Sequence, residues 1–257
     1  MGFFDFFKGK SDKDKGSKGG DSEKKEKKSS AARWAEAAAS KRAQAPDRQE
    51  ALQELAKLKT PEAVEALLKR FTFAIDPSIT DQEEKEFAYE GIVGAGKEAA
   101  VEPVRAFAAK AESVQWPIKI LKELCEEEEI VDELIKWLAR WDTEYAKFMD
   151  PKLQILDVLG DYKNEKIRPA VEPFLDDFTE EARYRAINTI LVQKEPESLE
   201  PLLNRLLEEE SVRTKNKILD GVANLGWDIP EEKRDPVRKV LPYEYGIDGS
   251  GKITKRG

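Results

Sequence analysis

The chain has 257 residues, of which 40% are hydrophobic and 37% charged, proportions typical of a water-soluble helical protein with enough apolar residues for a core. It contains no histidine and one cysteine, Cys125, which excludes Ser–His and Cys–His catalysis, an intramolecular disulfide and the usual zinc ligand sets. The formal charge is −8, made up of +3 over residues 1–30 and −11 over the remainder. We therefore expect a cytoplasmic, non-catalytic protein without a cofactor, metal ion or small-molecule substrate, and with no general affinity for nucleic acids.

An aromatic segment, MGFFDFFKGK, opens the chain, and a charged segment without any aliphatic or aromatic residue follows it up to residue 30. On a helical wheel the four phenylalanines, Phe3, Phe4, Phe6 and Phe7, fall on one side. We predict that residues 1–30 are an anchor peptide on a disordered tether. Burial of the Phe side chains would hold the protein peripherally at the inner face of a membrane, in a groove of a partner protein, or on its own folded body. The sequence leaves these three alternatives open.

Residues 31–242 carry apolar residues at helical spacing without strand-like alternation, which predicts an all-α region. A motif recurs there in which an aliphatic residue, a polar residue, often a proline and another aliphatic residue follow one another. Its copies are Val64 to Leu67, Val101 to Val104, Val131 to Leu134, Ile167 to Ala170, Leu199 to Leu202 and, in degenerate form, Arg234 to Val237. Their first positions are 34 residues apart on average, and a second apolar cluster precedes each copy. We therefore predict about six helical hairpins, each with two helices.

This repeat register assigns positions to particular residues. Pro103, Pro169 and Pro201 should lie in the first turn of the second helix of their repeats, where a missing N–H costs nothing. Aliphatic residues of the motif should be buried between the helical layers: Leu134, Ile167, Leu199 and Leu202. Glu200, between two of them, should be exposed.

Residues 155–225 contain the best-matching copies, LDDFTEEARYRAINTIL and LEEESVRTKNKILDGVANLGW. Each has an acidic turn, an arginine at the start of a first helix, Arg183 or Arg213, and then an aliphatic ladder. In these features the chain resembles the bacterial type of HEAT-like (armadillo-type) α-helical repeat protein, over about residues 47–242. The resemblance implies a right-handed α-α superhelix whose concave face, lined by the second helices, binds another protein as a scaffold or adaptor. Because phycobilin lyases and a DNA glycosylase also have such repeats, an enzyme or chromophore-handling protein remains the alternative.

The stretch GIVGAGK, from Gly91 to Lys97, has the spacing of a phosphate-binding loop, except that Glu98 stands where Ser or Thr would hold magnesium. Alignment with residues 160–163 of a later repeat indicates that its glycines end one helix and turn into the next. We therefore predict a turn between two helices and no nucleotide site.

The third repeat contains an acidic run and three tryptophans, Trp116, Trp137 and Trp141. The run from Glu126 to Glu129 could bind a cation or a basic partner, but such runs are more often helix junctions whose carboxylates stabilise the next helix. On that helix Trp141 falls near the centre of the apolar face, so we predict that it belongs to the core. Trp137 falls at the edge, and we predict it as a candidate for an exposed partner-binding anchor.

Residues 243–257 predict a short β-hairpin. Tyr243, Tyr245 and Ile247 lead into a Gly-rich turn, and Ile253 returns from it. We expect this hairpin to cover the last helices and cap the row of repeats. Its turn imitates an EF-hand loop but lacks the first and last acidic ligands, so we predict no calcium site.

Overall fold

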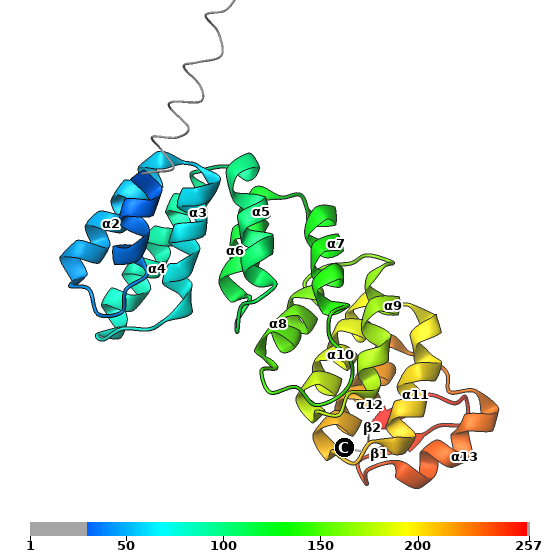
Figure 1. The fold of residues 1–257 in the computed structure, drawn as a ribbon. Coiled ribbons are helices and arrows are strands. Elements are labelled where there is room, and N and C mark those ends of the chain that lie inside the picture. The colour runs from blue at the N-terminus through cyan, green and yellow to red at the C-terminus, as the bar shows by residue number, and fades with distance from the viewer. Residues whose placement is uncertain (1–29, 256–257) are drawn as a thin grey trace, which may run out of the picture. The chain divides into compact units, whose positions relative to one another are not determined.

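The computed structural model of the chain describes residues 30–255. The chain divides into two compact units, residues 1–103 and 104–257, and the boundary falls inside helix α5 (Lys97–Ala108). The described residues are predominantly helical, with a small two-stranded antiparallel sheet near the C-terminus (Figure 1). The predicted all-α class with a C-terminal hairpin is therefore confirmed, whereas the Phe-rich anchor peptide lies outside the described residues.

The first unit contains helical residues 30–38 and a set of elements that precede α5. They are α2 (Ala45–Leu58), α3 (Pro61–Leu68), the 3-10 helix η1 (Lys69–Thr72) and α4 (Ser78–Val93). α3 begins where Thr60 Oγ1 accepts the Ala63 N–H at 3.3 Å, and Pro61 occupies a position that needs no N–H. α4 packs against α2 and α3 and buries Ala88 and Ile92.

Gly91 allows α4 to approach α2 closely. A Cβ atom on Gly91 would lie 2.9 Å from Ala56 Cβ and 3.3 Å from Leu67 Cδ1. Gly96, with φ +85°, forms the turn between α4 and α5. GIVGAGK is thus the end of a helix, a turn and the start of another helix, as predicted. The element before the turn is a helix, whereas a phosphate-binding loop follows a strand.

The second unit contains the end of α5 and a longer series of elements. They are α6 (Gln115–Leu124), α7 (Glu127–Leu138), α8 (Asp150–Leu159), α9 (Ile167–Val171), the 3-10 helix η2 (Glu172–Asp176), α10 (Glu180–Gln193), the 3-10 helix η3 (Pro196–Ser198), α11 (Leu199–Glu208), α12 (Val212–Leu225), α13 (Glu231–Val240), β1 (Tyr245–Ile247) and β2 (Ile253–Lys255). α8, α10 and α12 pack in series, and α7, α9–η2, α11 and α13 pack in a second series beside them. These two layers enclose a core that includes Leu156, Ile187 and Leu203.

The copies of the sequence motif fall on α3, α5, α7, α9, α11 and α13, that is, on alternate helices. This alternation agrees with the prediction of two helices per repeat. Leu134, Ile167 and Leu202 are fully buried, as predicted. Leu199 is only half-buried, because it is the first residue of α11, and Glu200 is exposed.

The prolines follow the predicted register in two of three repeats. Pro169 and Pro201 are each the third residue of their helices, α9 and α11, and so lie in the first turn. The prediction for Pro103 is wrong, because this residue lies inside α5. α5 begins earlier than the register predicts, since the Ala100 N–H already donates to Gly96 O at 3.0 Å.

The acidic run of the third repeat lies at a helix start. Glu126 is the N-cap of α7, and Glu129 Oε2 accepts the Glu126 N–H at 3.1 Å. The carboxylates of the first turn face the positive end of the helix dipole. The interpretation of this run as a helix junction is therefore confirmed.

The C-terminal hairpin packs on the last helices of the second unit. Its strands are antiparallel, with Ile247 opposite Ile253. Tyr245 and Ile253 are 2% and 5% exposed, and the Tyr245 hydroxyl donates to Asp220 Oδ1 of α12 at 2.8 Å. Because β2 contacts α12 and β1 contacts α13, the hairpin covers the final pair of helices.

The Gly-rich turn of this hairpin uses its acidic residue internally. Asp248 Oδ1 accepts the N–H groups of Ser250 and Lys252, each at 2.9 Å. Across residues 30–255, no group of three or more Cys, Asp or Glu side chains is arranged to hold a metal ion. Over the same residues, no helix combines the length and apolar character needed to cross a bilayer.

Candidate interaction surfaces

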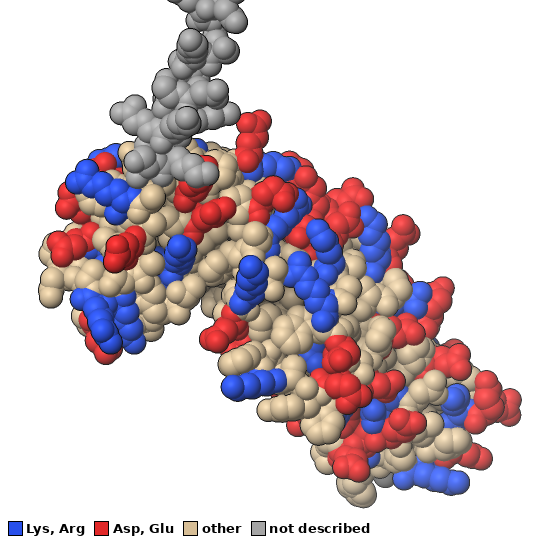
Figure 2. Space-filling model, in the orientation of Figure 1, with Lys and Arg blue, Asp and Glu red and all other residues tan. Residues whose placement is uncertain are grey.

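On the face drawn in Figure 2, acidic and basic side chains are interspersed over both units. The face drawn in Figure 2 has no extended basic region, and Asp and Glu side chains are present over all of it. A surface of this kind does not favour contact with a phosphate backbone. Two kinds of feature stand out against it, namely buried charge clusters and exposed aromatic side chains.

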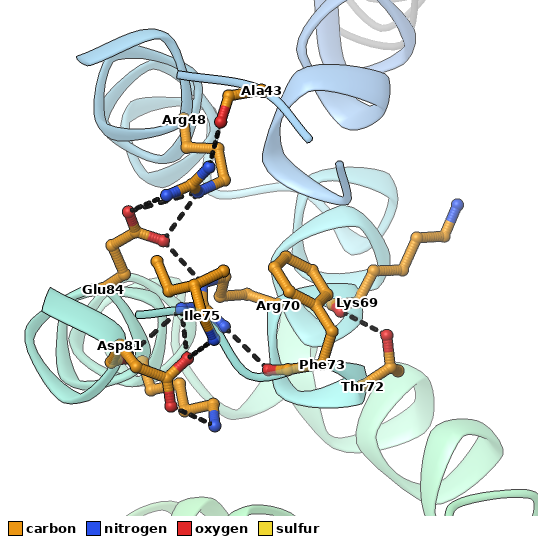
Figure 3. Close-up of polar contacts among 10 residues, drawn as sticks. Ala43, Arg48, Lys69, Arg70, Thr72, Phe73, Ile75, Asp81 and Glu84 are labelled. Atoms are coloured by element: carbon orange, nitrogen blue, oxygen red, sulfur yellow. Dashed lines mark hydrogen bonds and ion pairs between the residues drawn. The ribbon is translucent and has the colours of Figure 1, made fainter. Parts of the chain in front are cut away.

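A buried charge network connects α2, η1 and α4 in the first unit (Figure 3). Glu84, 2% exposed, accepts hydrogen bonds from Arg48 Nε at 3.0 Å and from Arg70 Nε at 2.7 Å. Arg70 is fully buried and also donates to Asp81 Oδ1 at 2.7 Å and to Phe73 O at 3.1 Å. Two arginines thus face two carboxylates. Their bonds hold the segment between η1 and α4 and fix the rotation of α4 about its axis.

Asp81 shows why this network is structural. Burial raises the pKa of Asp81. Hydrogen bonds from Lys85, Arg70 and the Ile75 N–H lower this pKa by more than burial raises it, so the net pKa lies below its ordinary value. The carboxylate therefore stays ionised at neutral pH and cannot supply a proton. Its role is to neutralise the buried Arg70.

Two buried ion pairs join successive helices of the second unit. Lys152 Nζ on α8 lies 2.6 Å from Asp177 Oδ2, in the turn before α10. Arg183 on α10 donates to both carboxylate oxygens of Glu209, at 2.8 and 2.9 Å, in the turn before α12. The side chains of Lys152, Asp177 and Glu209 have no exposed surface. Because a buried charge is costly unless it is paired, these bonds fix the turn before each helix against the preceding helix.

Three exposed aromatic residues lie where the loop 139–149 meets the turn before α10. Tyr145 and Phe178 are 68% and 69% exposed, and their rings pack edge to face with centroids 6.2 Å apart. Phe148, in the same loop, is 51% exposed. We call Tyr145, Phe148 and Phe178 the aromatic patch. Sequence analysis did not single out these residues, because they lie in a loop and a turn where no periodicity marks them.

The aromatic patch rests on a loop that is held by several hydrogen bonds. The Phe178 N–H donates to Thr143 O at 2.7 Å. Thr179 Oγ1 lies 3.2 Å from Met149 Sδ, and the buried Lys152 Nζ donates to a loop carbonyl at 3.3 Å. These bonds hold the loop and the turn that carry the aromatic side chains, which lowers the backbone entropy lost on binding.

A groove of about 470 Å³ lies between α9–η2 and α11, on the helices that the sequence assigns to the partner-binding surface. Its prolines are Pro169, Pro173 and Pro201, and its charged residues are Arg168, Glu172, Asp176, Arg205 and Glu208. Arg168 pairs with Glu172 at 2.9 Å, and Arg205 pairs with Asp176 at 3.2 Å. Acidic groups outnumber basic ones here, so this groove lacks the basic character that a DNA glycosylase would need.

The prediction that Trp137 is exposed is wrong. Its side chain is 2% exposed, and Nε1 donates to Glu133 Oε1 at 2.7 Å. Ala108 of α5 and Ile155 of α8 line, with Trp137, a small cavity of about 140 Å³. Neighbouring helices thus enclose a ring that the helical wheel of α7 alone places at an edge. Trp141, predicted to belong to the core, is partly exposed beyond the end of α7.

The chain matches no protein-family model and no curated protein. Among solved structures, one similar chain is described as "Computational Design of Self-Assembling Cyclic Protein Homooligomers". It is 13% identical, with 86% of this chain and 80% of that chain covered and a TM-score of 0.16. A score this low carries no argument about fold or function.

Proposed function

We propose that this chain is a non-catalytic scaffold of the HEAT-like helical-repeat kind, which binds another protein through its second unit. Two-helix repeats favour this function, because stacked repeats form a rigid surface whose exposed side chains can vary without disturbing the core. In this proposal the repeats form a right-handed solenoid. The Phe-rich peptide brings the scaffold to a membrane surface or to a larger assembly.

The observation that carries the proposal is the aromatic patch. Large aromatic side chains that are exposed on a fixed support are typical of the residues that dominate binding energy in protein interfaces. Exposed charged residues adjoin the patch in sequence: the acidic Asp142, Glu144 and Asp176, and Lys147, whose Nζ lies 5.0 Å from the centroid of the Phe148 ring. The three carboxylates outnumber the one ammonium group, which favours a partner segment that combines apolar and basic side chains over anionic lipid.

Affinity capture from native cells, followed by measurement with the purified partner, tests this function. The Tyr145→Ser and Phe178→Ser double variant should lose at least tenfold in affinity for a partner that the unchanged chain binds. Tyr243→Ser is the matched control, because Tyr243 is 87% exposed and lies outside the patch. Equal affinity of all three proteins would contradict the proposal. Loss of vesicle binding instead of partner binding would show that the patch contacts lipid.

A further inference from the structure

α4 of the first unit has an outer face with both apolar and acidic residues. Its buried side is formed by Glu84, Ala88 and Ile92. On the outer side, Ile79 is 70% exposed and Phe87 is partly exposed. These two residues line a shallow, solvent-open depression of about 600 Å³, together with Glu83, Glu86 and Glu90; every residue that lines it belongs to α4. We call these five residues the α4 groove.

The α4 groove has a fixed orientation. Glu84 bonds Arg48 and Arg70, and Asp81 bonds Arg70, all on the buried side of α4 (Figure 3). Because these bonds prevent α4 from rotating, Ile79 and Phe87 stay on the outer side. Residues spaced three or four apart share one face of a helix, so the carboxylates alternate with the apolar side chains along it.

Such a face fits a peptide that carries large apolar side chains followed by basic ones. Residues 1–10 of this chain have that composition, with four phenylalanines, interrupted by Asp5, followed by Lys8 and Lys10. We propose that the α4 groove is the docking site of this Phe-rich segment of the same chain. Phenylalanine side chains cover Ile79 and Phe87, and the two lysines face the groove carboxylates.

The length of the connecting chain permits this contact. Residues 11–29 separate the segment from the first described helix, and a random coil of 19 residues spans about 24 Å on average. A folded unit the size of residues 30–103 has a radius of gyration of about 11 Å. The helix at residues 30–38 and α4 belong to the same unit, so the segment can reach the groove without involving the second unit.

Docking within one chain needs little intrinsic affinity. A short flexible tether gives an effective concentration of about 1 mM, so a groove with a Kd of about 0.1 mM for the free peptide would be about 90% occupied. A membrane or a partner protein could then bind the phenylalanines only after the segment had left the α4 groove. The docking does not depend on what the aromatic patch of the second unit binds.

Titration of the full chain with a fluorescent peptide of residues 1–10 tests the proposal. The peptide should bind the variant in which Phe3, Phe4, Phe6 and Phe7 are all Ser, because that variant leaves the groove vacant. It should bind the unchanged chain about tenfold more weakly, because the native segment competes. Addition of salt should weaken both interactions, since the carboxylates contribute through screened charge.

Two changes in the groove provide the control for the site. Ile79→Ser with Phe87→Ser, and separately Glu83→Lys with Glu90→Lys, should each reduce peptide binding to the four-Ser variant at least tenfold. Tyr243→Ser should leave it unchanged. Equal binding to the unchanged chain and the four-Ser variant would overturn the proposal, as would binding that neither groove variant alters. Association of the unchanged chain into dimers through its phenylalanines would also overturn it, because the segment would then dock on a second copy.

Discussion

Lys152 Nζ lies 2.6 Å from Asp177 Oδ2, and neither side chain has any exposed surface. Lys152→Met should therefore lower the free energy of unfolding by about 3–5 kcal/mol, because it leaves the Asp177 carboxylate buried without its cation. Lys152→Met combined with Asp177→Asn should cost less than the sum of the two single changes. Urea unfolding followed by circular dichroism measures all three variants.

Lys166 offers the matched control for this pair. It bonds Asp132 Oδ1 at 2.7 Å, but it is 43% exposed, so Lys166→Met should change stability little. If Lys152→Met were as mild as Lys166→Met, the buried pair would not exist in solution.

Glu209 predicts an acid-side loss of stability. Burial raises the pKa of Glu209. Hydrogen bonds from Arg183 and the Ser211 N–H lower this pKa by more than burial raises it, so the net pKa lies below its ordinary value. A carboxyl group whose pKa is lower in the folded state stabilises the fold above its unfolded pKa of about 4.3. That stabilisation is lost as the pH falls from about 4.3 through the lower, folded value.

Unfolding midpoints in urea between neutral pH and acidic pH test this dependence. Glu209→Gln should be less stable than the unchanged chain at neutral pH, and the difference should shrink as the pH falls below the ordinary Glu value. Glu208→Gln is the control, because Glu208 is exposed on the last turn of α11. A difference between Glu209→Gln and the unchanged chain that stays constant with pH would contradict the assigned role.

Gly91 predicts a packing defect where the sequence resembles a phosphate-binding loop. Gly91→Ala would place a Cβ 2.9 Å from Ala56 Cβ, so α4 would have to move away from α2. Overpacking of this kind costs about 1–3 kcal/mol. Ala56→Gly should partly restore the stability of Gly91→Ala, since it removes the opposing methyl group. Thermal unfolding of both single variants and the double variant measures this coupling, and strict additivity would show that the two helices do not touch there.

Sequence periodicity predicted the alternation of helices and most of the buried motif positions, because these depend on local spacing of apolar residues. The start of α5 could not be predicted in the same way. Its Pro103 resembles Pro169 and Pro201 in sequence, but Gly96 begins the helix early, so the proline lies inside it. The preference of proline for the first turn of a helix does not determine how many helical residues precede a particular proline.

Tertiary contacts decided what the sequence could not. Lys152, Asp177 and Glu209 are charged, and charged residues are rarely buried unless paired. In the sequence, the only indication of such pairs was the acidic turn of the repeat together with Arg183 at the start of the helix that follows it. Trp137 was misplaced for the same reason, since a wheel of one helix contains no information about α5 and α8. The aromatic patch could be recognised only from the folded structure, because it brings together a loop and a turn that lies about 30 residues later in the chain.

The Phe-rich segment predicts weak and reversible binding to anionic vesicles. Its four phenylalanines would bury apolar surface in the lipid interface, and the +3 charge of residues 1–30 would add a screened attraction. Vesicle binding should therefore weaken as salt rises and should vanish when all four phenylalanines become Ser. Co-sedimentation of the full chain with vesicles at low and high salt measures this.

The α4 groove should reduce this binding, because it competes for the same phenylalanines. Ile79→Ser with Phe87→Ser removes the competing surface and should increase the fraction of protein that sediments with vesicles. Tyr243→Ser, which alters an exposed aromatic side chain elsewhere, should have no effect. If the full chain and the Ile79→Ser, Phe87→Ser variant both stay in the supernatant at low salt, the segment does not bind membranes. The four-Ser variant should then be tested for loss of a protein partner, since a groove of a partner protein is then the remaining alternative to docking on the chain's own folded body.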